Sequence, residues 1–156
     1  MDNALREAWL DDNGIELTNN GAPTAKNVTV GKIVADNNDN IGLVVYSNGN
    51  IALSNITAQN NVYHGIDATN NYMGGSLTIS GSSTLSFNGY NGLNALTDGT
   101  VSISGVLAEY NERDGIFVQD GGAGKTVLVK TSTLRFNKWP GLQIFEEVLE
   151  LRRKTL

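Results

Sequence analysis

Short segments of alternating apolar and polar residues recur along most of the chain, and they come in sets of three. In each set one segment follows a glycine, as in GLVV at 42–45, and a second is a triplet such as IAL at 51–53. The third segment ends at one apolar residue per set: Ala35, Ala58, Leu85, Ala108 and Leu134. Alternation over a few positions is the period of a half-buried β-strand. Because turn-forming Asn, Asp and Gly separate the segments, the pattern predicts three short strands per repeat.

A constant spacing defines the repeat. Glycine followed by Ile or Leu occurs six times, at steps of 23 to 28 residues: Gly14, Gly42, Gly65, Gly92, Gly115 and Gly141. In the first repeat Leu10 stands four residues before the glycine, whereas the other five repeats have an asparagine there: Asn38, Asn61, Asn88, Asn111 and Asn137. The offset holds while the repeat length varies. This indicates a structural repeat rather than a bias in composition.

Coils of this length cannot bury an apolar face alone, whereas stacked coils bury a shared core between parallel strands about 4.8 Å apart. The Asn-x-x-x-Gly-[Ile/Leu] repeat of residues 13–145 resembles the right-handed parallel β-helix proteins of the pectin-lyase-like group. The resemblance implies an all-β fold, a single-stranded right-handed parallel β-helix of about six coils, in one domain spanning residues 1–156. It also implies an extracellular location for a natural parent protein, but it does not specify an activity.

The five repeat asparagines are expected to be structural. At strand spacing, each side-chain amide can donate to the asparagine of the next coil, and its remaining groups can pair with the turn backbone. A buried amide without partners costs about 1–3 kcal/mol, whereas each hydrogen bond of a ladder contributes about 0.5–1.5 kcal/mol. We therefore predict an asparagine ladder. We also place the repeat glycines in turns, because Gly and Asn both tolerate the left-handed backbone angles that turns use.

Both ends of the chain are predicted to carry short capping helices, because open strand edges promote aggregation. Residues 2–10 begin with candidate N-cap residues and place Leu5, Ala8 and Trp9 on one face. Residues 146–156 begin acidic and end basic, which suits the helix dipole. This last segment contains no Asn or Gly, in contrast to the repeats. Such a contrast is typical of a designed cap and favours an engineered chain.

Composition limits the expected partners. The net charge is −5 and the pI is about 4.7, so no basic face for nucleic acid is expected. The chain has no cysteine and one histidine, so we expect no disulfide, no metal site and no cofactor. The first residues lack the pattern of a signal peptide, and the longest apolar run, IGLVVY, is too short to cross a bilayer. We expect a soluble monomer that does not associate with membranes.

Candidate catalytic groups are scarce. His64 stands directly before a repeat glycine, and the same position elsewhere holds residues with no shared chemistry: Ile41, Asn91, Asp114 and Pro140. We therefore interpret His64 as an exposed turn residue. Hydrolysis of sugars uses two nearby carboxyl groups, yet the outward column after Gly-[Ile/Leu] puts no two acids on adjacent coils: Glu16, Val44, Asp67, Asn94, Phe117 and Gln143. We predict no catalytic residue.

One outward column carries aromatic and cationic side chains. After Asn40 in the same column, four residues stand two positions before successive repeat glycines: Tyr63, Tyr90, Arg113 and Trp139. Aromatic rings beside a guanidinium group can bind sugars or anions, although simple stacking between coils would give the same pattern. This row is the candidate ligand-binding site, and a glycan is the candidate partner.

Three functions remain open. The first is a non-enzymatic structural role, in which the β-solenoid is a rigid scaffold stabilised by the asparagine ladder and by caps. The second is carbohydrate binding or adhesion through the aromatic row, as a fragment of an exported surface protein. The third is a truncated polysaccharide lyase or hydrolase, which the lack of an acid cluster disfavours.

Overall fold

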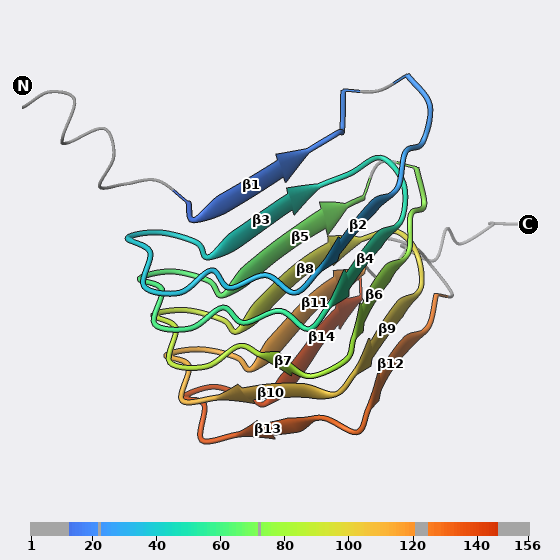
Figure 1. Ribbon diagram of the computed structural model, residues 1–156. Coiled ribbons are helices and arrows are strands. Elements are labelled where there is room, and N and C mark those ends of the chain that lie inside the picture. The colour runs from blue at the N-terminus through green and yellow to red at the C-terminus, as the bar shows by residue number, and fades with distance from the viewer. Residues whose placement is uncertain (1–12, 22, 72, 121–124, 147–156) are drawn as a thin grey trace, which may run out of the picture.

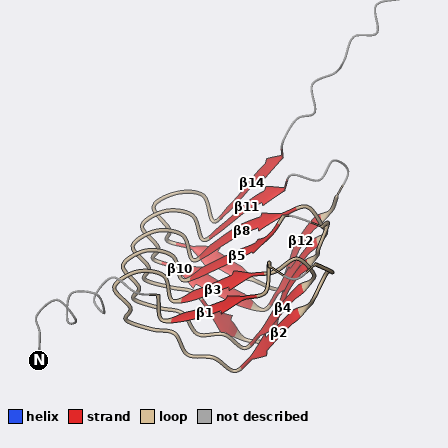
Figure 2. Ribbon diagram, turned by 90° about the horizontal axis from the view of Figure 1, so that it is seen from above, coloured by secondary structure: helices blue, strands red, loops and turns tan. Residues whose placement is uncertain are grey.

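The computed structural model describes residues 13–21, 23–71, 73–120 and 125–146. Within these residues fourteen β-strands form three sheets, and all the paired strands are parallel. The chain visits each sheet in turn and returns to the first sheet one level further along, so it winds as a parallel β-solenoid (Figure 1). Figure 2 shows the turns that connect the sheets stacked over one another.

The first sheet contains the six strands that follow the repeat glycines. In spatial order they are β1 (Ile15–Thr18), β3 (Leu43–Tyr46), β5 (Ile66–Asn70), β8 (Leu93–Thr97), β11 (Ile116–Asp120) and β14 (Leu142–Glu146). The second sheet contains five strands: β2 (Val28–Gly31), β4 (Ile51–Ser54), β6 (Leu77–Ser80), β9 (Val101–Ser104) and β12 (Val127–Lys130). The third sheet is the shortest: β7 (Ser83–Thr84), β10 (Val106–Glu109) and β13 (Thr133–Arg135). Single parallel bridges between Val34, Thr57 and Thr84 continue it into the first two coils.

The register stacks equivalent residues of successive coils. In the first sheet, the residue after each repeat glycine pairs with its counterpart in the next coil: Ile15, Leu43, Ile66, Leu93, Ile116 and Leu142. Side chains alternate between the two faces of a strand, so these residues and every second residue after them face the interior. Leu43, Ile66 and Leu93 are 0% exposed. One apolar core therefore extends through the stacked coils.

The repeat asparagines form a continuous ladder of hydrogen bonds. From Asn38 to Asn137, the side-chain Nδ2 of each asparagine donates to Oδ1 of the next over 2.8–3.0 Å. The same Oδ1 also accepts the backbone N–H of the preceding asparagine. The Nδ2 groups of Asn88, Asn111 and Asn137 also donate to backbone carbonyl oxygens of the third segment, namely those of Ala58, Leu85 and Ala108. The three inner asparagines are at most 2% exposed, so the ladder provides partners that buried amides require.

The repeat glycines are required because there is no room for a Cβ atom, and not because the backbone needs a positive φ. The described glycines with positive φ are Gly74, Gly81 and Gly105, and none of these is a repeat glycine. A Cβ added at Gly65 would lie 2.6 Å from the carbonyl oxygen of Gly92, so a side chain there would push neighbouring coils apart. Left-handed angles are therefore found at other glycines and at some asparagines, but not at the repeat glycines. The left-handed position is instead the residue before each ladder asparagine: Asn37, Asn60, Phe87, Tyr110 and Phe136.

The prediction of capping helices is wrong for the residues that the structure describes, none of which is helical. Glu146, the predicted first residue of the C-terminal helix, ends β14 and pairs with Asp120 of β11. Pairing with the preceding coil satisfies the backbone of this segment and outweighs its helix propensity. The predicted caps at 2–10 and 147–156 lie outside the described residues. The strands make five complete turns rather than six coils, since no described strand of the other two sheets follows β14.

Candidate functional site

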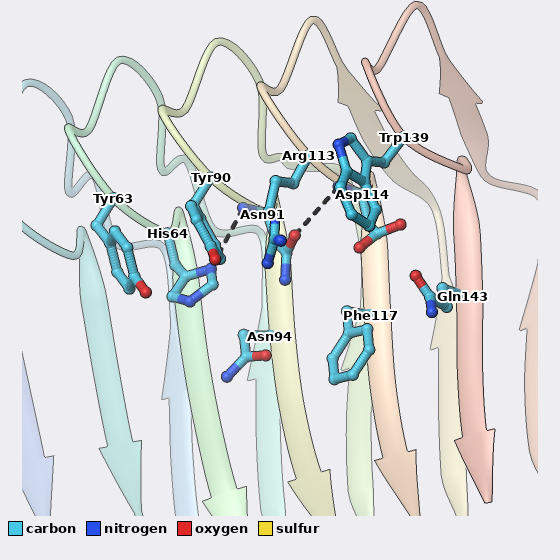
Figure 3. A pocket seen from close by; sticks show the side chains of 10 residues that line it. All are labelled: Tyr63, His64, Tyr90, Asn91, Asn94, Arg113, Asp114, Phe117, Trp139 and Gln143. Atoms are coloured by element: carbon cyan, nitrogen blue, oxygen red, sulfur yellow. Dashed lines mark hydrogen bonds between the residues drawn. The ribbon is translucent and has the colours of Figure 1, made fainter.

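The row of Tyr63, Tyr90, Arg113 and Trp139 lies on the turns that lead into the first sheet. The backbone N–H of Tyr63 donates to the carbonyl oxygen of Asn40, one coil earlier. Equivalent bonds of 3.0–3.3 Å link Tyr90 to Tyr63, Arg113 to Tyr90 and Trp139 to Arg113. These bonds hold equivalent residues one above another at the strand spacing. The structure therefore brings all four predicted side chains together on one side of the solenoid (Figure 3).

The four side chains form one stack. The ring centroids of Tyr63 and Tyr90 are 4.5 Å apart, with an angle of 24° between the rings. The guanidinium carbon of Arg113 lies 4.3 Å from the ring centroid of Tyr90 and 4.4 Å from that of Trp139. Cation–π contacts on both faces fix the guanidinium plane. Among the described residues, no carboxylate forms an ion pair with Arg113, so the donors at the edge of the guanidinium stay available to a ligand.

A hollow of about 390 Å³ lies beside the row. One side of it is formed by outward side chains on three consecutive strands of the first sheet, namely Asn94 of β8, Phe117 of β11 and Gln143 of β14. Figure 3 shows these three side chains below the stacked row. The hollow therefore combines aromatic side chains with amide, guanidinium and carboxylate groups.

The residues directly before the repeat glycines form a second set of hydrogen bonds between coils. Oδ1 of Asn13 accepts the N–H of Ile41 at 3.3 Å, Nδ1 of His64 accepts the N–H of Asn91 at 3.3 Å, and Oδ1 of Asn91 accepts the N–H of Asp114 at 3.1 Å. His64 is 5% exposed, so its interpretation as an exposed turn residue is wrong. The physical reason is that Asn13, His64 and Asn91 each carry an acceptor for a backbone N–H of the next coil, although they differ in residue type.

His64 is held as a neutral acceptor. Its ring makes edge contacts with Tyr63 and Tyr90, at centroid distances of 4.4 and 5.0 Å. Since Nδ1 accepts the N–H of Asn91, the proton of the neutral ring lies on Nε2. Burial lowers the pKa of His64 from 6.5 to about 4, and the positive charge of Arg113 acts in the same direction. His64 is therefore uncharged at neutral pH.

Asp114 carries an unpaired carboxylate oxygen. The residue is 3% exposed, and its Oδ1 has no hydrogen-bond partner among the described residues. The next residue of the column is Pro140, which has no N–H to donate. Burial raises the pKa of Asp114, while the positive charge of Arg113 opposes this shift. An unpaired buried acceptor costs about 1–3 kcal/mol, and Asp114 is one of the residues that line the hollow.

A further carboxylate, Asp67, lies on the outward face of β5. Its register partners are Val44 and Asn94, so neither neighbouring strand places an acid beside it. Nδ2 of Asn94 donates to Asp67 at 3.3 Å. Burial raises the pKa of Asp67, and the hydrogen bond from Asn94 opposes this shift. The described residues contain no group of three or more His, Asp or Glu that could hold a metal ion.

A second row of aromatic side chains was not predicted from the sequence. Phe87, Tyr110 and Phe136 stack at centroid distances of 5.0 and 5.1 Å, with angles of 8° and 20° between the rings. The three rings are about half exposed and stand at the left-handed positions. They line a separate hollow with the ion pair of Glu112 and Lys138. Counting back five residues from each repeat glycine finds this row in the sequence.

One comparison with known proteins agrees with the observed fold. A family model for the right-handed β-helix region matches residues 13–153. No curated protein and no solved structure matches the chain. In the described part, no helix is long and apolar enough to span a bilayer. The match covers most of the sequence and includes every coil of the solenoid, so the chain belongs to the family of right-handed β-helix proteins.

Proposed function

We propose that the protein is a non-enzymatic, carbohydrate-binding β-helix. The observation that carries the proposal is the stack of Tyr63, Tyr90, Arg113 and Trp139 beside a hollow of about 390 Å³. Sugar sites combine apolar aromatic surface, which contacts the C–H groups, with a few placed polar groups, which bind the hydroxyls. Rings that repeat at the strand spacing suit a chain of sugar units better than a single sugar.

The row is already ordered before any ligand arrives. Tyr63 is 40% exposed and Trp139 is 50% exposed, yet each ring contacts a neighbour of the stack and the backbone of its turn is hydrogen-bonded to the adjacent coil. A ligand therefore binds without first ordering flexible side chains, each of which would otherwise cost about 0.5–1.5 kcal/mol. Exposed, ordered rings of this kind favour binding over a role in the core.

Binding without turnover is favoured by the ionisable groups of the hollow. Its described lining contains one carboxylate, Asp114. Glycoside hydrolysis uses two carboxyl groups roughly 5–9.5 Å apart, one as acid and one as base or nucleophile. Incubation with polygalacturonate, followed by reducing-end and ultraviolet absorbance assays, tests the alternative of a truncated polysaccharide-active enzyme. Release of oligomers would contradict the non-enzymatic proposal.

A purely structural role is the second candidate, and the asparagine ladder favours it. A continuous ladder and one long core make the solenoid a rigid scaffold whether or not it binds a ligand. In that case the aromatic row is only stacking between coils. The two candidates differ in one measurable property, which is affinity for a glycan.

Screening on a glycan array, followed by calorimetric titration of the best oligosaccharide, separates the two candidates. The double variant Tyr63→Ala, Tyr90→Ala should bind at least about fivefold more weakly, because each of the two ring contacts contributes about 0.5–1.5 kcal/mol. Tyr110→Ala is the matched control, since it removes the same side chain from the second row. Equal affinity of the folded double variant and the wild type would contradict the proposed site, and no binding to any glycan would favour the scaffold.

A further inference from the structure

The column of residues before the repeat glycines follows one rule with one interruption. Where a side chain has an acceptor, it takes the backbone N–H of the same position in the next coil, as Asn13, His64 and Asn91 do. Asp114 holds the acceptor in the next position of this series, but Pro140 supplies no N–H. The result is a carboxylate that is 3% exposed, lines the hollow and keeps one oxygen without a partner.

We infer that Asp114 is the specificity-determining residue of this site and that it accepts hydrogen bonds from the hydroxyl groups of a neutral glycan. The inference rests on the proposed carbohydrate binding. A carboxylate can only accept hydrogen bonds, so its partner must carry a donor. Hydrogen bonds to a charged group are about twice as strong as neutral ones, and a sugar hydroxyl reaching this oxygen would remove the penalty of an unpaired buried acceptor.

The charges around the hollow select a neutral ligand. Within the described lining, Arg113 is the basic side chain and Asp114 the acidic one, and the other side chains are uncharged at neutral pH. A sugar carboxylate would be attracted by Arg113 but repelled by Asp114. An ammonium group would be attracted by Asp114 but repelled by Arg113. The net charge of −5 adds a weak long-range repulsion against polyanions. A sugar with hydroxyl groups alone avoids both conflicts.

Neighbouring groups fit the same ligand. Figure 3 shows the Asp114 carboxylate beside Trp139, on the side of its turn where Phe117 and Gln143 lie. Gln143 offers a donor and an acceptor on one amide, and no described residue hydrogen-bonds to this side chain. The edge of Arg113 offers further donors. Aromatic surface with mixed donors and acceptors matches a polyol better than an apolar ligand.

Pro140→Ala tests the inference without removing any group that faces the ligand. The substitution returns a backbone N–H to the position that donates to the column, so Oδ1 of Asp114 becomes paired. With cellohexaose, xylohexaose and mannohexaose as neutral ligands, we expect the wild type to bind at least one, and Pro140→Ala to weaken that affinity about fivefold or more. The melting temperature should stay the same or rise. The pKa of Asp114, followed by the ¹³C signal of its carboxyl carbon, should fall in Pro140→Ala even without sugar.

Asp114→Asn provides the second variant and reverses the selection by charge. Without the carboxylate, Arg113 is the remaining charge in the hollow, so the affinity for hexagalacturonate should rise relative to that for the neutral hexaose. Preferential binding of hexagalacturonate by the wild type, or unchanged neutral affinity in Pro140→Ala, would overturn the role of Asp114 and leave carbohydrate binding intact. Absence of binding to all four hexamers would overturn both proposals together.

Discussion

Asn88 is the residue at which the contribution of the ladder can be measured most cleanly. Its side chain is 0% exposed and makes four hydrogen bonds. Nδ2 donates to Oδ1 of Asn111 and to the carbonyl oxygen of Ala58, while Oδ1 accepts the backbone N–H and the side-chain Nδ2 of Asn61. Asn88→Ala removes all four bonds and leaves their partners buried. At about 0.5–1.5 kcal/mol per bond, the free energy of unfolding should fall by about 2–6 kcal/mol.

Urea unfolding followed by circular dichroism measures this loss, provided that the slope with urea concentration does not change. Asn38→Ala is the matched control at the end of the ladder. Its side chain donates one bond, to Oδ1 of Asn61, and its backbone N–H keeps its own bond to the same atom. The control should therefore lose only about 0.5–1.5 kcal/mol. Equal losses in the two variants, or a loss below about 1 kcal/mol for Asn88→Ala, would refute the additive reasoning.

Two further predictions concern His64 and Gly65. Because the pKa of His64 falls from 6.5 to about 4 on folding, it contributes about 3 kcal/mol of stability that is present above pH 6.5 and lost as the pH falls toward 4. His64→Asn keeps an acceptor for Asn91 but does not titrate, so urea unfolding between pH 7 and 4 should show a weaker pH dependence in the variant; an unchanged profile would contradict this. Gly65→Ala should cost about 1–3 kcal/mol, since its Cβ would lie 2.6 Å from a backbone oxygen. Gly21→Ala, with nothing within 4 Å, should leave the melting temperature nearly unchanged, and equal shifts in the two variants would refute the steric argument.

The ladder and the aromatic row could be predicted because a solenoid brings equivalent positions into contact. Asn61 and Asn88 are 27 residues apart in the sequence, yet their side chains lie 3.0 Å apart because both stand four residues before a repeat glycine. The same logic places Tyr63 beside Tyr90. When the repeats are aligned on their glycines, residues in one column of the alignment lie next to one another on successive coils. Residue types that hydrogen-bond to their own kind, or that stack, can therefore be predicted from the sequence alone.

Other features depend on backbone geometry that residue types do not reveal. The role of His64 follows from an N–H in the next coil, which is invisible when the column is compared by side chain alone. The unpaired oxygen of Asp114 arises for the same reason, because it depends on what Pro140 lacks. Glu146 has high helix propensity, yet pairing with Asp120 keeps it in a strand. In each case a backbone hydrogen bond between coils, present or missing, decides the role of the residue.

The location of a bound sugar is the most direct test of the proposed function. A titration of ¹⁵N-labelled protein with the best neutral hexaose, followed by ¹H–¹⁵N correlation spectra, reports on every backbone amide and on the indole N–H of Trp139. We predict that the shifts concentrate on the turns of Tyr63, Tyr90 and Arg113 and on this indole signal. Shifts centred on Tyr110 and the second aromatic row, or no shifts at millimolar sugar, would contradict the account.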